Sequence, residues 1–290
     1  MSESIESLRR KIDGAAELGS VVRTMKALAA SGITQFERAV HALDDYYRTV
    51  ELGLIACLRE DGQRSEDNCG RNCATCAVIF GSDQGLVGQY NEDLVEFTVA
   101  GLNGMAGSKH VLTVGERIQG ALSDTELSPS GSFSVPNSIA AITQLVARVL
   151  IEIETLRERG KIDQVYLFHN KPKSGAVYNP VMQRLLPLDD TWREQFTGIT
   201  WPTNNLPEVI GNATLQALTR EYLFISLFRA CAEAMASENA SRLAAMQRAE
   251  KNIDELLEEL NQSYNRQRQS SIDEELFDVV SGFEALKANR

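Results

Sequence analysis

The last quarter of the chain carries an apolar seam that constrains the fold more than any other feature. Its positions recur every three or four residues, so that fourteen steps cover 49 residues, a mean of 3.5. Such a repeat keeps one face of a helix against a partner helix and winds the pair left-handed. No proline follows Pro207, and the only later glycines are Gly211 and Gly282, so nothing between them has to break the helix. The seam consists of Leu215, Leu218, Tyr222, Ile225, Phe228, Ala232, Met235, Asn239, Leu243, Met246, Ala249, Ile253, Leu256, Leu260 and Tyr264.

The start of the chain supplies a companion for this helix. A seam with the same spacing runs through a predicted helix from about Ser4 to Arg59, with Gly19 and Lys26 as its misfits. A helix on the order of 100 Å long cannot be buried by a globular domain of this size, and long helices need packing to be stable. We therefore expect the two ends to pair as an antiparallel coiled coil; the alternative is two separate amphipathic helices on a globular core. The second seam consists of Leu8, Ile12, Ala15, Gly19, Val22, Lys26, Ala29, Ile33, Phe36, Val40, Leu43, Tyr47, Val50, Leu54 and Cys57.

The middle of the chain alternates predicted strands with predicted helices. Short apolar runs indicate strands at 74–80, 111–114, 163–169 and 177–188, and amphipathic patterns indicate helices at 91–102 and 138–159. Residues 123–137 are rich in Ser, Pro and Gly and predict a loop with at most one short strand. The predicted fold class is α/β: a long antiparallel coiled coil with an inserted Rossmann-like domain. The predicted domains are 1–60, 74–190 and 207–287.

Composition excludes several classes of protein. The net charge of −11 argues against a nucleic-acid surface, which needs an excess of Lys and Arg. No apolar run approaches the roughly 20 residues of a membrane-spanning helix, and the N-terminus lacks the pattern of a secretory signal. Five cysteines, an odd number, fit a reducing compartment better than a disulfide framework. We therefore expect a soluble chain of the cytoplasm.

Two motifs invite an enzymatic interpretation. Cys69, Cys73 and Cys76 have the spacing C-x3-C-x2-C, which can hold an iron–sulfur cluster and resembles the motif of radical S-adenosylmethionine enzymes. That motif normally follows the first strand of a barrel, whereas this one precedes the first strand, so structural cysteines without a metal are preferred. The glycine-rich run 81–88 follows a strand, but its spacing matches neither common phosphate-binding pattern, and a tight strand-to-helix turn is preferred. No histidine lies in the context of a nucleophile and base.

Several motifs in order along the chain resemble the gamma subunit of rotary F-type ATP synthases. Residues 236–249 (ASENASRLAAMQRA) resemble the signature of that family, and residues 25–31 (MKALAAS) resemble its Met-containing helix motif. Residues 82–91 (SDQGLVGQYN) and 185–187 (LLP) resemble its strand-end motifs. The similarity extends over nearly the whole chain.

The resemblance implies a rotor shaft rather than a catalyst, with no cofactor and no catalytic residue. Its expected partners are the alpha and beta subunits of the catalytic ring, the epsilon subunit and the c-subunit ring of the membrane sector. The chain would then be peripheral, at the cytoplasmic face of a bacterial membrane. A coiled-coil adaptor unrelated to ATPases and an iron–sulfur enzyme stay open as alternatives.

The resemblance also assigns residues that touch the beta subunits. Met25 and Lys26 match the site that meets an acidic lever loop, and Arg268 and Gln269 match an Arg-Gln pair that contacts a second loop; a guanidinium suits forked contact with carboxylate or carbonyl. An apolar end of the last helix implies a bearing against another subunit, and the alternative is a fraying terminus. This end consists of Phe277, Val279, Val280, Phe283 and Leu286.

The sequence departs from the family pattern at several positions. Gly32 stands where the family usually has a basic residue, and Val87 replaces a common cysteine. The acidic balance and the cysteine motif are also unusual. These departures suggest a divergent branch, such as the alternative F-type ATPases found beside standard ones in some bacteria.

Overall fold

The computed structural model describes residues 4–60, 73–173, 176–188, 192 and 211–288. The chain divides into two compact units, one formed by residues 1–28 and 243–290 and the other by residues 29–242. Helices α1 (Ile5–Glu60) and α6 (Gly211–Ala288) contribute to both units.

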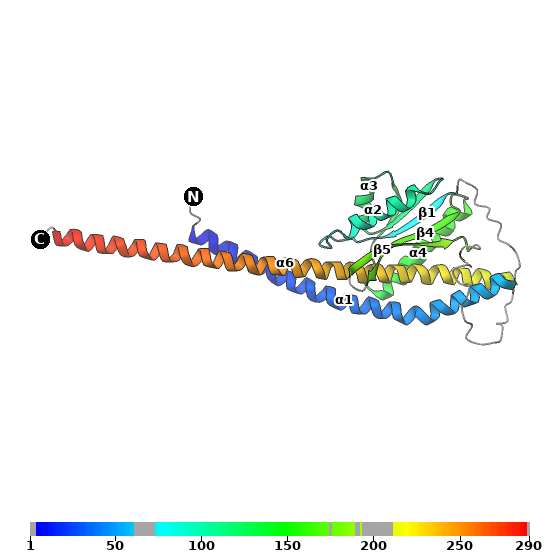
Figure 1. Ribbon diagram of the computed structural model, residues 1–290, viewed down its shortest axis with the longest axis horizontal. Coiled ribbons are helices and arrows are strands. Elements are labelled where there is room, and N and C mark those ends of the chain that lie inside the picture. Colours follow the sequence, from blue (N-terminus) through cyan, green and yellow to red (C-terminus); the bar gives the residue numbers. More distant parts are fainter. Residues whose placement is uncertain (1–3, 61–72, 174–175, 189–191, 193–210, 289–290) are drawn as a thin grey trace. The chain divides into compact units, whose positions relative to one another are not determined.

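A five-stranded sheet forms the centre of the unit 29–242 (Figure 1). Its strand order is β3-β2-β1-β4-β5, and β1, β2, β3 and β4 run parallel while β5 is antiparallel to β4. Parallel neighbours need crossover connections, which here are helices. The strands are β1 (Thr75–Phe80), β2 (Lys109–Val114), β3 (Pro129–Phe133), β4 (Gln164–Lys173) and β5 (Ala176–Leu186).

Helices cover both faces of this sheet, as the alternation of β1 requires. Cys76, Val78 and Phe80 pack in one core with α4 (Ile139–Glu158) and with the parts of α1 and α6 in this unit. Ala77 and Ile79 point to the other face and pack with α2 (Tyr90–Asn103) and α3 (Glu116–Ser123). Because all six residues of β1 are buried, the strand reads as a continuous apolar run.

Within this unit α1 and α6 run antiparallel. A Cβ added at Gly32 would lie 3.0 Å from the Asn239 side chain, and one added at Gly53 would lie 3.1 Å from Leu218. Residue numbers thus rise along α1 while those of the contacting residues on α6 fall, as in an antiparallel pair. The close approach at Asn239 gives a structural reason for the glycine at position 32.

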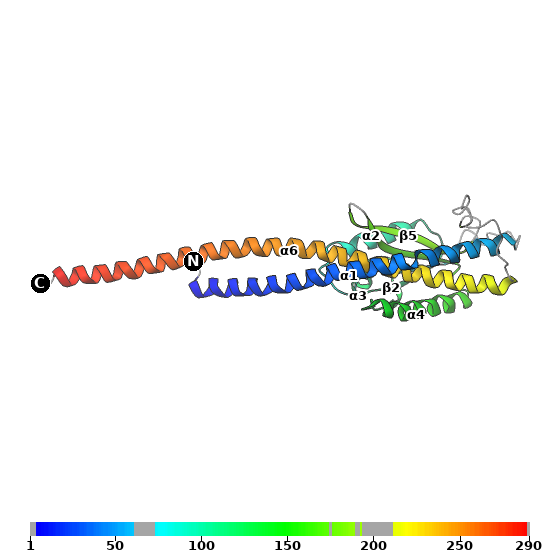
Figure 2. The same ribbon diagram turned by 90° about the horizontal axis from the view of Figure 1, so that it is seen from below.

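The same two helices form the unit 1–28 with 243–290, and they are antiparallel there too (Figure 2). Val22, Met246 and Ile253 make its buried core, and Met25 packs against them. In both views α6 continues past the first residues of α1, and residues 272–282 of α6 are all exposed.

The predicted seams match the buried faces with one exception. Every position of the N-terminal seam is buried or half-buried, and so is every position of the C-terminal seam except Leu256, which is 46 % exposed. Leu257 packs against the core in its place. The buried face of α6 therefore continues from Ile253 to Leu257, a step of four residues, whereas the predicted seam took a step of three to Leu256.

The predicted fold class is confirmed, with corrections of detail. Helix α3 was not predicted, β3 is the short strand allowed within 123–137, and β4 extends to Lys173, beyond the predicted end at 169. Helix α6 begins at Gly211, and residues 207–210 of the predicted third domain lie outside the described residues. The domain ranges 1–60, 74–190 and 207–287 stay a prediction, because the compact units divide both long helices.

Candidate functional site

The glycine-rich turn after β1 is held by bonds within the protein. The Ser82 backbone N–H donates to Asn91 Oδ1 at 3.1 Å, and Asn91 Nδ2 donates to Ser82 Oγ at 2.8 Å. Asp83 accepts from the backbone N–H of Glu116 at 3.0 Å and from that of Val135 at 2.9 Å. The Ser82 N–H and the Asp83 carboxylate are thus engaged, and this arrangement favours a structural turn over a phosphate loop.

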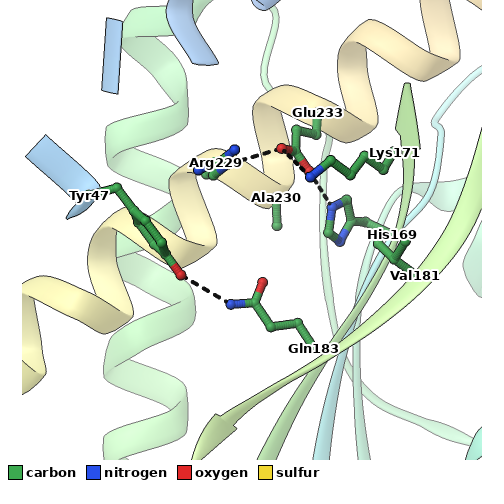
Figure 3. A pocket seen from close by; sticks show the side chains of 8 residues that line it. All are labelled: Tyr47, His169, Lys171, Val181, Gln183, Arg229, Ala230 and Glu233. Carbon is green, nitrogen blue, oxygen red and sulfur yellow. Dashed lines mark hydrogen bonds and ion pairs between the residues drawn. The ribbon is translucent and has the colours of Figure 1, made fainter. Parts of the chain in front are cut away.

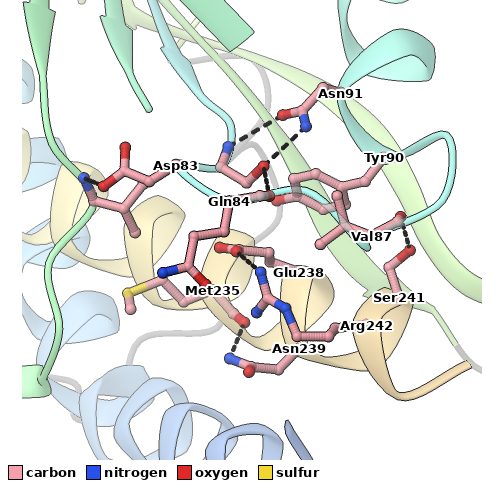
Figure 4. Close-up of polar contacts among 12 residues, drawn as sticks. Asp83, Gln84, Val87, Tyr90, Asn91, Met235, Glu238, Asn239, Ser241 and Arg242 are labelled. Atoms are coloured by element: carbon pink, nitrogen blue, oxygen red, sulfur yellow. Dashed lines mark hydrogen bonds and ion pairs between the residues drawn. The ribbon is translucent and has the colours of Figure 1, made fainter. Parts of the chain in front are cut away.

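The turn and the start of α2 contact α6 (Figure 4). Tyr90, fully buried, donates its hydroxyl to the Ala234 carbonyl at 2.9 Å, and Ser241 Oγ donates to the Val87 carbonyl at 2.5 Å. The carboxyl ends of parallel strands are where open α/β sheets usually bind ligands. At this edge of β1 the chain's own helix α6 takes that place.

Glu238 lies beside these contacts on the buried face of α6. Its carboxylate accepts from Arg242 Nη2, one helical turn further along the same helix. Burial raises the pKa of Glu238, and Arg242 opposes that rise. This pair is therefore contained within one element.

A second ion cluster, centred on Glu233, connects several elements (Figure 3). His169 Nε2 on β4 lies 2.9 Å from Glu233 Oε2, while Arg229 Nε lies 3.0 Å and Lys171 Nζ 3.5 Å from Oε1. Arg229 Nη1 also reaches Asp44 Oδ1 on α1 at 3.2 Å. Burial would raise the pKa of Glu233, but the hydrogen bond and charge of His169, together with Arg229 and Lys171, lower it to about 2.

This Glu233 cluster borders a cavity of about 310 Å³ whose wall also includes Tyr47 and Gln183. Gln183 Nε2 on β5 donates to the Tyr47 hydroxyl on α1 at 3.3 Å, and the Arg229 guanidinium lies over the Tyr47 ring. No local pattern of residues predicts the cluster. Its members are separated by up to 189 positions, from Asp44 to Glu233, and only the fold brings them together.

The predicted contact residues Met25 and Lys26 lie in the unit 1–28 with 243–290. Met25 is half-buried against the core of that unit. Lys26 Nζ donates to Glu250 Oε2 at 2.5 Å, and Arg23 Nε lies 4.0 Å from the other oxygen of the same carboxylate. The lysine in the apolar seam is thus paired across the two helices, with its side chain 35 % exposed.

Arg268 and Gln269 are exposed on α6, further along the helix than the residue that pairs with Lys26. From Glu250, the partner of Lys26, to Arg268 is 18 residues, about 27 Å of helix at 1.5 Å per residue. The structure therefore does not join the two predicted contact pairs into one site.

The predicted apolar end is exposed where it is described. Phe277 is 72 % and Val279 71 % exposed, and Val280 is 47 % exposed. Ile272 and Leu276 are exposed beside them. Phe283 and Leu286 belong to α6, but their side chains lie outside the described part of the chain.

The two described cysteines of the motif, Cys73 and Cys76, are not placed as metal ligands. Cys73 is disulfide-bonded, and Cys76 is a free thiol buried in β1, where burial raises its pKa to about 12. A metal ligand must be a thiolate, which such burial opposes. Cys69 lies outside the described residues. Among the residues that are described, no group of three or more His, Cys, Asp or Glu side chains is placed to hold a metal ion.

Within the described ranges, no helix contains a stretch long and apolar enough to cross a membrane.

Comparisons with known proteins point to one family over nearly the whole chain. A family model described as ATP synthase matches residues 4–286. The chain is 28 % identical to the ATP synthase gamma chain of Moorella thermoacetica, over 98 % of this chain and 99 % of the relative. It is also 28 % identical to the gamma chain of Salinibacter ruber, over 98 % of each.

Solved structures share the fold. A chain of the Euglena gracilis mitochondrial ATP synthase (OSCP, F1 and c-ring) matches with a TM-score of 0.73 at 18 % identity, covering 98 % of this chain and 95 % of that chain. A chain of the Tetrahymena thermophila central stalk and c-ring matches with a TM-score of 0.58 at 22 % identity, covering 79 % and 99 %. These matches give no support to the iron–sulfur enzyme or to an unrelated adaptor.

Proposed function

Because the chain belongs to the ATP synthase gamma-chain family, the central-stalk subunits of rotary F-type ATP synthases, we propose how its two units share the work of a rotor. The paired helices of the unit 1–28 with 243–290 turn inside a ring of alternating alpha and beta subunits. The α/β domain of the other unit, with an epsilon subunit, stands on the c-subunit ring. Rotation then couples ion flow through the membrane to ATP synthesis or hydrolysis in the beta subunits.

The observation that best supports this proposal is the bare end of α6. Residues 272–282 are exposed and include five large apolar side chains, although a free apolar surface of this kind is unfavourable in water. A ring of subunits around the helix would cover it. The five are Ile272, Leu276, Phe277, Val279 and Val280.

The shaft can shift a beta subunit between its binding states only if the shaft's contacts have a different free energy in each state. A shaft that presents different groups to each beta subunit stabilises a different state in each one. Met25 and Lys26 are the proposed contacts at one level, and Arg268 and Gln269 at another. Phe277, Val279, Val280, Phe283 and Leu286 form the proposed bearing.

The proposed chain is non-catalytic and needs no cofactor of its own. ATP is bound and hydrolysed by the beta subunits, and this chain transmits the resulting movement. It would be a peripheral subunit at the cytoplasmic face of a bacterial membrane, held there by the c-ring.

The experiment is co-expression of the tagged chain with alpha and beta subunits of the same organism. We expect a stable complex with ATPase activity, whereas the chain alone is inactive. An adaptor unrelated to ATPases would leave the alpha and beta subunits in the unbound fraction. A purified chain with ATPase activity of its own would contradict the non-catalytic role.

A further inference from the structure

A rotor that works as proposed must carry torque between its α/β domain and its helices. The apolar core beneath the sheet holds these elements together, and the hydrophobic attraction itself has no preferred direction. Hydrogen bonds between charged groups are directional and define a position around the helix axis. The buried ions of the unit 29–242 are therefore the groups to consider for this role.

We propose that the Glu233 cluster is the torque-bearing joint that makes the α/β domain turn with α1 and α6, an inference that rests on the proposed function. Its ion pairs run from Asp44 on α1 through Arg229 and Glu233 on α6 to His169 and Lys171 on β4. One connected set of charges thus holds both long helices and the sheet. Figure 3 shows its members on α6 and β4.

The centre of this joint is buried, whereas its ends at Asp44 and Lys171 are 45 % and 48 % exposed. The side chains of His169 and Glu233 are 4 % and 6 % exposed, so water does not compete for their hydrogen bond. Both oxygens of Glu233 are engaged, and Arg229 uses separate nitrogens for Glu233 and Asp44. Removal of the central carboxylate would take away the counter-charge of the buried His169, while Arg229 would keep Asp44.

The chain contains a matched control on the same helix. Glu238 is as buried as Glu233, at 7 % against 5 % exposure, and it also pairs with an arginine four residues away. Its ion pair, however, stays within α6, whereas that of Glu233 joins three elements. Replacement of either glutamate by glutamine removes a buried carboxylate, but only the replacement of Glu233 also removes the ion pairs that join the elements.

The test uses the complete ATP synthase reconstituted into vesicles, with ATP hydrolysis and ion pumping measured on the same sample. For Glu233→Gln we expect hydrolysis near the wild-type rate and a fall of roughly threefold or more in ions pumped per ATP, the scale on which network residues change coupling. For Glu238→Gln we expect the wild-type ratio. A wild-type ratio for Glu233→Gln, or an equal fall in both variants, would overturn the proposal.

A second variant covers the case in which Glu233→Gln does not assemble. Asp44→Asn removes only the α1 end of the joint and leaves the Glu233 contacts to Arg229, Lys171 and His169 in place. We expect a smaller fall in ions pumped per ATP, and an unchanged ratio would contradict the joint. Failure of the wild-type chain to join the complex would instead reject the proposed function itself.

Discussion

Glu233 carries its charge at a position where a lone carboxylate would be protonated. Burial opposes ionisation, and three basic side chains outweigh it. The pair formed by Glu238 and Arg242 shows the opposite balance, because there burial prevails and the pKa of the carboxyl is raised. Two glutamates on one helix, five residues apart, therefore respond to pH in opposite directions.

Glu233 predicts a loss of stability in acid. Its pKa falls from 4.5 unfolded to about 2 folded, so its contribution is complete above pH 4.5 and disappears as pH falls toward 2. The shift corresponds to about 3 kcal/mol of unfolding free energy. Denaturant unfolding of the full chain between about pH 6 and about pH 2, a range that covers both pKa values, should show a smaller loss of stability in acid for Glu233→Gln than for the wild type.

Glu238→Gln is the control for this measurement. A carboxyl with a raised folded pKa destabilises the protein as pH rises from 4.5 through that folded pKa, so the variant should remove a stability loss that develops on raising the pH, opposite in direction to that of Glu233. Identical pH profiles for Glu233→Gln and the wild type would contradict the assignment.

Gly81 is required by the packing of α3 against the end of β1. A Cβ at this position would lie 2.3 Å from Ile118 Cβ, which no rotamer change relieves. We expect Gly81→Ala to lower the free energy of unfolding by about 3 kcal/mol, as overpacking does in tight cores. Gly120→Ala, whose added Cβ meets nothing within 4 Å in α3, should instead stabilise by up to about 1 kcal/mol. Equal stabilities in thermal unfolding would refute the steric argument.

At the scale of elements, the periodicity of apolar residues predicted those helices and strands that bury a regular face. The seams of α1 and α6 and the strands β1, β2 and β4 follow from spacing and apolar runs, since each buries a regular face. Leu256 was assigned wrongly because adjacent leucines offered two registers, and packing selects Leu257.

Features that depend on tertiary contact could not be predicted in this way. Helix α3 has eight residues and buries only Ile118 and Leu122, too few for a periodic signal. The antiparallel direction of β5 is set by its pairing with β4. The Glu233 cluster has no local pattern at all, because histidine, lysine and aspartate reach it from other elements.

The exposed part of α6 should matter for the assembled complex and not for the folding of the chain. Arg268→Ala with Gln269→Ala should leave the unfolding free energy within about 0.5 kcal/mol of the wild type, as is usual for exposed positions. In the assembled complex the same variant should lower the ATPase rate or the ions pumped per ATP. Lys251→Ala with Glu255→Ala removes an exposed ion pair on the same helix and should change neither. Wild-type turnover and pumping in the Arg268 and Gln269 variant would remove these residues from the contact.

At the scale of the whole molecule, the two units share α1 and α6 and differ in what else they contain. The unit 29–242 adds a sheet with helices on both faces, whereas the elements described in the other unit are α1 and α6. The strand-end edge at β1, where such sheets often bind small molecules, is taken by α6 through Tyr90 and Val87. The α/β domain thus uses that edge to hold a helix.

Rotation of the chain inside an immobilised alpha–beta ring is the most direct test of this account. Asn103→Cys at the exposed end of α2 offers an attachment point for a bead on the α/β domain. With ATP present, we predict sustained rotation of the bead in one direction, and its arrest when ATP is removed. Continued ATP hydrolysis by the complex, with a bead that only fluctuates about a fixed angle, would contradict the rotor account.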